Sequence, residues 1–293
     1  MWDLSGKLLA EFKGHQNGVK TVSFSPDGKR IVTASFDSTA RMWDLSGKQL
    51  AELRGMPSSV RSASFSPDGQ RIVTVSNDNT ARVWDIAGKL FAELKGHREY
   101  VHSASFSPDG QRIVTASNDG TARVWDTSGK QLVELKGHQG NVISASFSPD
   151  GQRIVTASID HTARVWDLSG KQLVELKGHQ GNVNSASFSP DGQHIVTSSY
   201  TTTRIWDLSG KPLVELKGHE KGVNSASFSP NGKLIVTSSD DNTARVWDLS
   251  GKQLFELNGH QDSVNSASFS PDGQHIVTSS DIAVAKAVRT SRQ

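Results

Sequence analysis

The stretch that decides the fold, Gly96–Asp126, reads GHREYVHSASFSPDGQRIVTASNDGTARVWD. Three runs rich in Val, Ile, Ala, Thr and Phe are separated by a Ser-Pro-Asp-Gly turn and by Asn118–Gly120. Pro108 suits the second position of a type I turn, and Gly110 can take the left-handed conformation that closes a bulged hairpin. The runs have the length of strands, and a fourth follows at Gln131–Leu135. The unit therefore predicts a four-stranded antiparallel meander.

The same unit recurs along the whole chain. All seven tryptophans stand before an aspartate, at intervals of 40 or 41 residues: Trp2, Trp43, Trp84, Trp125, Trp166, Trp206 and Trp247. Phe-Ser-Pro-(Asp/Asn)-Gly recurs seven times, and Gly-His recurs at His15, His97, His138, His179, His219 and His260. This arrangement resembles the WD-repeat (WD-40) β-propeller family over residues 1 to about 281. The resemblance implies an all-β ring of four-stranded blades.

The chain begins and ends inside a repeat. It opens at a Trp-Asp, with Lys7–Phe12 as a fourth strand that has no blade before it, and its last repeat lacks the Gly-Lys fourth strand. Joining the two ends removes two exposed sheet edges, so we expect a seven-bladed propeller whose last blade is completed by the N-terminal strand, residues 5–13. The expected blades are 14–54, 55–95, 96–136, 137–177, 178–217, 218–258 and 259–289, all in one domain spanning 1–293, with 290–293 a disordered tail.

The third strand of the last blade is the least regular part of the pattern. Val284–Val288 aligns with the Thr-Ala-Arg-Val-Trp-Asp of other repeats but lacks the tryptophan and aspartate. Two possibilities stay open: the segment forms a strand, or Ile282–Val288 is helical or frayed. In the second case Trp2 fills the gap left by the missing tryptophan.

Composition narrows the class of protein. The net charge of +2 is too close to zero to indicate nucleic acid as a partner, and the chain has no cysteine. No apolar run approaches the ~18 residues of a membrane span, and the N-terminus lacks the pattern of a signal peptide. We therefore expect a cytoplasmic, monomeric ring that binds neither nucleic acid nor membrane.

The repeated His, Asp and Thr residues are of the types that catalytic sites use. The resemblance instead assigns them to a structural tetrad in which Asp accepts from His, and His, Thr and Trp form a chain of hydrogen bonds. A catalytic or metal site would not be needed once in every blade. The complete sets are His15, Thr33, Asp37, Trp43; His97, Thr115, Asp119, Trp125; His138, Thr156, Asp160, Trp166; and His219, Thr237, Asp241, Trp247. Three blades depart from the pattern, at Met56, at Ser199–Thr203 and at Ile282.

The chain carries no recognisable enzyme motif. We find no Gly-x-Ser-x-Gly, no phosphate-binding loop and no His-x-x-x-His. The repeated Ser-Ala-Ser has no base partner outside the tetrads. Arginines in the third strands, such as Arg123, face a glutamate-bearing outer strand and are explained by cross-strand pairing. We expect no enzyme activity, no cofactor and no metal.

What varies between repeats is one rim of the ring. In the family that this chain resembles, partners usually dock there, at the residues flanking the first valine of each blade and just before the tetrad aspartate. The aromatic, aliphatic and basic residues at these positions fall mainly in the first blades: Lys20, Phe36, Arg61, Tyr100, His102, Ile143, Ile159 and Tyr200. The sixth and seventh blades offer only small, polar or acidic residues, among them Asn224, Asp240, Ser263, Asn265 and Asp281.

Aromatic residues and arginine are the usual anchors of protein interfaces. We therefore predict a non-catalytic scaffold that presents this rim to a protein or peptide. Two alternatives stay open: a purely structural or self-assembling module, alone or as part of a larger array, and recognition of an anionic ligand by Lys20, Arg61 and His102.

Overall fold

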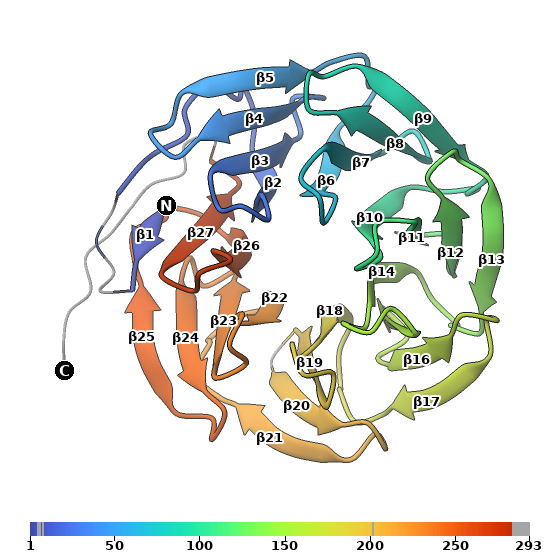
Figure 1. Ribbon diagram of the computed structural model, residues 1–293. Helices are drawn as coiled ribbons and strands as arrows, with labels where there is room; N and C mark the ends of the chain where they lie inside the picture. The colour runs from blue at the N-terminus through green and yellow to red at the C-terminus, as the bar shows by residue number, and fades with distance from the viewer. Residues whose placement is uncertain (5–6, 8, 201, 283–293) are drawn as a thin grey trace.

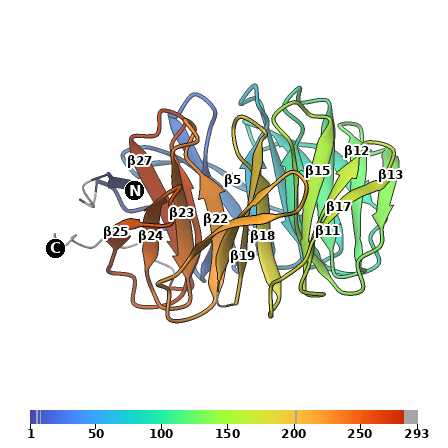
Figure 2. The same ribbon diagram turned by 90° about the horizontal axis from the view of Figure 1, so that it is seen from below.

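The computed structural model describes residues 1–4, 7, 9–200 and 202–282. Seven sheets are arranged around a central axis, with the first strand of each sheet innermost (Figure 1). Seen from the edge, the ring is a flat disc with turns on both faces (Figure 2). The predicted seven-bladed propeller is confirmed.

Six blades have four antiparallel strands in chain order. The first two contain β2 (Val19–Phe24), β3 (Arg30–Ser35), β4 (Ala40–Asp44), β5 (Gln49–Leu53), β6 (Val60–Phe65), β7 (Arg71–Ser76), β8 (Thr80–Asp85) and β9 (Leu90–Lys95). The third and fourth contain β10 (Val101–Phe106), β11 (Arg112–Ser117), β12 (Thr121–Asp126), β13 (Gln131–Lys136), β14 (Val142–Phe147), β15 (Arg153–Ser158), β16 (Ala163–Asp167) and β17 (Gln172–Leu176). The fifth and sixth contain β18 (Val183–Phe188), β19 (His194–Ser199), β20 (Thr203–Asp207), β21 (Pro212–Leu216), β22 (Val223–Phe228), β23 (Leu234–Ser239), β24 (Ala244–Asp248) and β25 (Gln253–Leu257).

The hydrophobic core lies between neighbouring blades rather than within one blade. Val32, Met42 and Leu53 of the first blade, for example, pack with Val60 and Ile72 of the second in one buried cluster. Both faces of each sheet are therefore covered, and the second strands are buried along nearly their whole length. A blade cannot bury its apolar residues alone, so stability depends on a closed ring.

Short polar side chains join the innermost strands of neighbouring blades. In the second blade the Ala63 amide donates to Thr21 Oγ1 at 3.2 Å, and the Ala63 carbonyl accepts from Ser23 Oγ at 3.3 Å. The carbonyl contact repeats around the ring, and Ser268 of the last blade closes it by donating to the Val22 carbonyl at 3.5 Å. The repeated Ser-Ala-Ser thus satisfies backbone groups on the free edge of each inner strand.

The third strands carry the expected cross-strand ion pairs. Arg123 is in register with Glu134 of the outer strand, and Arg123 Nη2 lies 3.2 Å from Glu134 Oε1. Equivalent pairs join arginine to glutamate in the other complete blades, at 3.1 to 3.7 Å. Cross-strand pairing therefore accounts for these arginines, as predicted.

The seventh blade combines both ends of the chain. It contains β26 (Val264–Phe269), β27 (His275–Ser280) and, as its third strand, β1 (Trp2–Asp3), which pairs with β27 (Figure 1). Trp2 is buried and donates from Nε1 to Thr278 Oγ1 at 3.0 Å, so it takes the place of the missing tryptophan. The predicted alternative at Val284–Val288 lies outside the described residues, as does the expected tail at 290–293.

The N-terminal chain closes the ring as predicted, but β1 is the strand that does so. Within the described residues, the predicted outer strand at 5–13 is replaced by an irregular segment, in which the Leu9 amide donates to the Met1 carbonyl at 2.9 Å. Glu11 nevertheless lies where other blades have their outer strand. Its carbonyl oxygen would be 2.6 Å from a Cβ added to Gly47, and the carbonyl oxygen of Glu93, in the outer strand β9, would be 2.7 Å from a Cβ added to Gly129. A regular fourth strand needs a third strand to pair with, and in β1 two residues, Trp2 and Asp3, pair with β27.

Deleting residues 1–13 is expected to destabilise the whole ring. The deletion removes Trp2 and also Met1, Ala10 and Phe12, which pack with Trp43 in the core between the last and first blades. Loss of one buried tryptophan alone typically costs about 3–5 kcal/mol, and the exposed edge of β27 would favour aggregation. Thermal unfolding and analytical ultracentrifugation measure both effects, with Trp2→Ala as the milder comparison. A truncated chain that stays monomeric with an unchanged Tm would contradict closure through the N-terminus.

Candidate functional site

A β-bulge in the first strand of every blade positions one side chain at the channel. In the third blade Val101 pairs with Ser117 and Ser103 with Ala116, so His102 is the extra residue. The same shift recurs in the other first strands. A bulge turns the extra side chain out of the regular alternation of a strand. The residues at this position are Lys20, Arg61, His102, Ile143, Asn184, Asn224 and Asn265.

These seven bulge residues line one cavity at the mouth of the channel. The cavity has a volume of about 320 Å³, and the residue after each bulge, a serine or threonine, completes its wall. Four of the eight predicted rim residues meet here: Lys20, Arg61, His102 and Ile143. The channel mouth is therefore a place where every blade contributes a side chain from a position that varies between repeats.

Three basic side chains from consecutive blades converge at this mouth, and each is held by an asparagine oxygen. Lys20 Nζ donates to Asn265 Oδ1 at 2.9 Å. Arg61 Nε donates to Asn77 Oδ1, and His102 Nε2 is bonded to Asn118 Oδ1. An amide oxygen orients a cation without neutralising it, so the positive charge at the mouth is retained.

Burial and neighbouring charges shift the pKa values of these basic groups. Burial lowers the pKa of Lys20, Asp281 raises it, Arg61 lowers it and Asp240 raises it. Burial also lowers the pKa of His102, with contributions in the same direction from the charges on Arg61 and Lys20. Burial lowers the pKa of Arg61 as well. Each of these groups is therefore partly removed from water, so its charged form lacks part of its hydration.

Blades six and seven place carboxylates at the mouth, and these also accept hydrogen bonds from asparagine side chains. Asn224 Nδ2 donates to Asp240 Oδ1 at 2.7 Å, and Asn265 Nδ2 donates to Asp281 Oδ1 at 2.6 Å. Between the two charged arcs, the fourth blade contributes the apolar Ile143 to the cavity wall. The mouth is therefore electrically polarised, with the cations Lys20 and Arg61 on blades one and two and carboxylates on blades six and seven.

The other predicted rim residues lie around this mouth with unequal exposure. Tyr100 is 42% exposed, and Arg61 Cζ lies 5.8 Å from the centre of its ring. Tyr200 is 64% exposed, whereas Phe36 and Ile159 are half-buried rather than open to solvent. Their burial has a local cause, because the Phe36 amide donates to the Gly18 carbonyl at 3.0 Å and the Ile159 amide to the Asn141 carbonyl at 3.1 Å. These bonds hold the loop between the second and third strands against the start of the first.

The tetrad residues form a chain of hydrogen bonds beneath this rim. In the third blade His97 Nδ1 lies 2.8 Å from Asp119 Oδ2, and His97 Nε2 lies 2.7 Å from Thr115 Oγ1. Trp125 Nε1 donates to the same Thr115 oxygen at 2.9 Å. Since a carboxylate only accepts, Nδ1 of a neutral imidazole carries the proton and Nε2 accepts from the threonine hydroxyl. The sets that begin with His15, His138 and His219 have the same geometry.

The second and fifth blades replace part of this chain. In the second blade Thr74 Oγ1 contacts Met56 Sδ at 3.5 Å, and Asp78 instead accepts from Arg82 Nη2 at 2.6 Å. In the fifth blade His179 Nδ1 lies 3.1 Å from Thr202 Oγ1, which takes the place of a carboxylate. Both substitutes keep the loop attached to the third strand.

The seventh blade leaves one ring nitrogen without a partner. His260 Nε2 lies 2.7 Å from Thr278 Oγ1, but His260 Nδ1 is buried and forms no hydrogen bond within the described residues. Ile282 stands where other blades have the tetrad aspartate. Burial lowers the pKa of His260 to about 4, and burial lowers that of His179 to about 4 as well. Both histidines are therefore neutral at neutral pH.

Comparison with known proteins decides the family. The family model described as "WD domain, G-beta repeat" matches residues 6–44, 47–85, 88–126, 129–167, 170–207, 210–248 and 251–281. The chain belongs to the WD40 family. The five matches from 47–85 to 210–248 each start just before the outer strand of one blade and end with the third strand of the next, so these repeats link two blades.

A curated relative agrees with this assignment. A stretch of 38 residues is 50% identical to a WD repeat-containing protein of Schizosaccharomyces pombe that is described as uncharacterized. The match covers 13% of this chain and 10% of that protein. The chain thus spans about a tenth of the length of that curated relative, and the likeness concerns the WD40 repeat alone.

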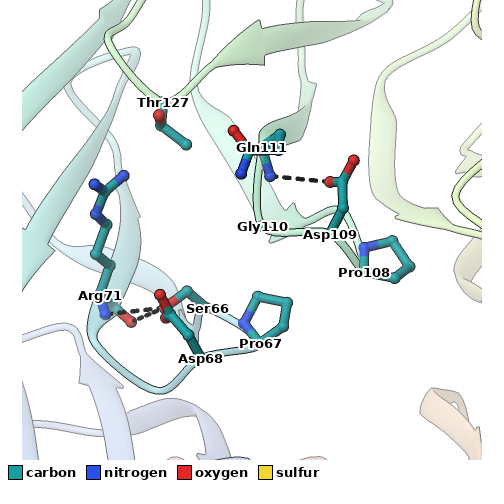
Figure 3. A pocket seen from close by; sticks show the side chains of 9 residues that line it. All are labelled: Ser66, Pro67, Asp68, Arg71, Pro108, Asp109, Gly110, Gln111 and Thr127. Carbon is teal, nitrogen blue, oxygen red and sulfur yellow. Dashed lines mark hydrogen bonds between the residues drawn. The ribbon is translucent and has the colours of Figure 1, made fainter.

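The opposite face of the propeller has hollows of a different kind. One, of about 420 Å³, lies between the Ser-Pro-Asp-Gly turns of the second and third blades (Figure 3). Its carboxylates hold their own turns, as Figure 3 shows for Asp109, which accepts from the Gln111 amide at 2.9 Å. Arg71 Cζ lies 4.3 Å from the centre of the Phe91 ring. A similar hollow separates the next two turns, so these are repeated gaps whose carboxylates hold the turns themselves.

Metal-binding clusters and membrane-spanning helices are both absent from the described part of the chain. Residues 1–4, 7, 9–200 and 202–282 contain no group of three or more His, Asp or Glu side chains placed to hold a metal ion. Within the same ranges, no helix is long and apolar enough to span a membrane.

His138→Ala is expected to loosen the upper loop of the fourth blade. The substitution leaves Asp160 and Thr156 without their shared partner, at a cost of about 1–3 kcal/mol. The amides of Gln139 and Thr162, which donate to Asp160, should then exchange faster with deuterium. Met56→Ala is the control, because Asp78 is held by Arg82 and the Thr80 amide should keep its protection. Unchanged exchange at Gln139 would show that the histidine does not support the loop.

Ile282→Asp is expected to flatten the pH dependence of stability. His260 has a folded pKa of about 4, below the unfolded value of 6.5, so the unfolded state binds more protons and stability falls as pH drops between these values. At about 1.4 kcal/mol per pKa unit, the loss is on the order of 3 kcal/mol. A carboxylate at position 282 should raise the His260 pKa and reduce this loss. Urea unfolding from pH 7 to pH 4 measures it, and equal slopes in wild type, Ile282→Asp and the uncharged Ile282→Asn would contradict the assignment.

Proposed function

We propose that this protein is a non-catalytic scaffold that binds a protein or peptide across the channel mouth and the rim around it. The observation that carries the proposal is the bulge in each first strand. Much of each blade repeats nearly unchanged, whereas the bulge presents Lys, Arg, His and Ile on blades one to four and Asn on blades five to seven. Family membership supports the general role, since WD40 propellers are typically interaction scaffolds.

The rim residues on blades one to five are proposed as the contact surface: Lys20, Phe36, Arg61, Tyr100, His102, Ile143, Ile159 and Tyr200. Tyr100 and Arg61 form its centre, because the guanidinium lies near the exposed ring and the two side chains come from neighbouring blades. Tyrosine and arginine combine a large contact area with polar ends, and they are common energetic anchors of interfaces. We propose a monomeric, cytoplasmic propeller of blades 14–54 to 259–289 that needs no cofactor.

The tetrads are proposed to have a structural role. Every described tetrad lies beneath the rim, and each ends on a buried tryptophan in the third strand. Their imidazoles are committed to threonine and aspartate, so they have no free nitrogen for a substrate. This arrangement supports rigid presentation of the rim rather than chemistry.

The double variant Arg61→Ala, Tyr100→Ala is expected to abolish capture of a partner without altering folding. Truncating one anchor typically costs about 2 kcal/mol or more of binding free energy, whereas peripheral contacts cost little. Asn224→Ala with Ser263→Ala is the control on the other side of the mouth and should retain capture. Cross-linking and affinity capture with matched melting curves compare the variants. Equal loss from both pairs would place binding elsewhere, and a wild-type ring that captures nothing would favour a purely structural module.

A further inference from the structure

We propose that the channel mouth binds an extended segment of a protein partner that carries one acidic and one basic side chain, with the carboxylate seated among Lys20, Arg61 and His102 and the cation seated at Asp240 and Asp281. The inference rests on the proposed function and specifies the chemistry of the partner. It follows from how the charges at the mouth are held.

The basic arc places two cations, Lys20 and Arg61, beside the imidazole of His102, and none of the three forms an ion pair within the described residues. Each is instead oriented by the side-chain oxygen of an asparagine. The third-strand arginines differ, because Arg123, for example, lies 3.2 Å from Glu134 and 3.6 Å from Asp119. Partly buried cations held in this way gain more from an incoming carboxylate than solvated ones do.

The acidic arc, Asp240 and Asp281, is likewise oriented by asparagine side chains, here through their N–H groups. Asp240 and Asp281 each accept from an asparagine N–H and form no ion pair within the described residues. Asn265 joins the two arcs directly, because its oxygen accepts from Lys20 while its nitrogen donates to Asp281. Asn265 thus lies between Lys20 and Asp281 and holds both without a direct ion pair between them.

This polarity selects against a polyanion and for a segment of mixed charge. A phosphopeptide or a nucleic acid that reached Lys20 and Arg61 would also meet the field of Asp240 and Asp281, and like-charge contacts of this kind suppress wrong partners. The chain's net charge of +2 gives no compensating long-range attraction. The cavity of about 320 Å³ has room for side chains of a segment but not for a folded element.

Capped peptides with one Glu and one Lys, separated by Gly-Ser linkers of graded length, provide the test. Binding is followed by NMR through the His102 imidazole and the Arg61 side-chain N–H. The best mixed peptide should bind saturably, and Glu→Gln in the peptide should lower its affinity about ten-fold or more, as expected for a hydrogen bond to a charged group. Arg61→Gln should have the same effect on the Glu/Lys peptide and little further effect on the Gln/Lys peptide. Asp240→Asn should weaken only peptides that contain Lys.

Arg98→Gln is the matched control. Arg98 is an exposed arginine in the loop that leads to the first strand with His102, and it does not line the cavity. It should leave the affinity of the mixed peptide within about two-fold, since exposed charges contribute little. Arg61→Lys keeps the charge and should restore part of the affinity lost in Arg61→Gln.

Three outcomes overturn the proposal. Equal losses in Arg98→Gln and Arg61→Gln would mean unspecific attraction. Tighter binding of a phosphoserine peptide or a short oligonucleotide than of the mixed peptide would assign the mouth to polyanions. A rim that captures its protein partner while the peptides show no charge selectivity would reject the charge pairing and leave the scaffold intact. If the peptides bind selectively but capture of the protein partner does not depend on Arg61 and Tyr100, the charge-paired peptide site is supported and the proposed scaffold function is rejected.

Discussion

The free edge of each innermost strand is the constraint on which the ring depends. The first strand of a blade pairs with one neighbour only, so half of its backbone groups face the next blade. Buried or half-buried amide and carbonyl groups must find partners, and serine and threonine hydroxyls supply both a donor and an acceptor at short reach. Ser23 and Thr21 do this for Ala63, and Ser268 does it for Val22 where the last blade meets the first. Small side chains here also allow the strands to approach closely around the channel.

Stability and variation are separated within each blade. The tetrads, the inter-blade cores and the hydroxyl contacts repeat from blade to blade, and they fix the position of the first strand. The bulge residue takes no part in the strand register, so it is free to differ. Asparagine at 77, 118 and 265 then fixes the orientation of the charged groups without cancelling them. A rigid frame with adjustable side chains at one end is well suited to recognition, because little conformational entropy is lost on binding.

Much of this was accessible from the sequence because the relevant signals are local and periodic. The strand runs, the Ser-Pro-Asp-Gly turns and the spacing of tryptophans predict the blades and their number, and Gly110 has the positive φ of 69° that its turn requires. The membership of the polar chains followed from the family resemblance, including the departures at Met56 and Ile282. The contact of Arg123 with Glu134 was predictable because residues that face each other across two strands are fixed by register.

The remainder depends on relations between blades, which a repeat pattern does not encode. Nothing in Ser-Ala-Ser distinguishes a nucleophile from a hydroxyl that bonds the neighbouring backbone until the two strands are placed side by side. The bulge at His102 and the half-burial of Phe36 depend on how a loop folds over the strand start. The irregular segment at Leu9 reflects the two-residue length of β1, so the pattern that gives a strand elsewhere does not give one here.

The bulge at each strand start also bears on how such a ring could change its specificity over evolutionary time. The bulge asparagines of blades five to seven each donate to a valine carbonyl of the next first strand. The bulge side chains of blades one to four form no such bond within the described residues, so a substitution there alters the mouth with little change to the frame. Duplication or exchange of nearly identical blades would reorder the seven bulge residues, and each asparagine blade would carry its own bond to the next blade along. Recombination among repeats can therefore produce new arrangements of charge around the channel from an unchanged fold.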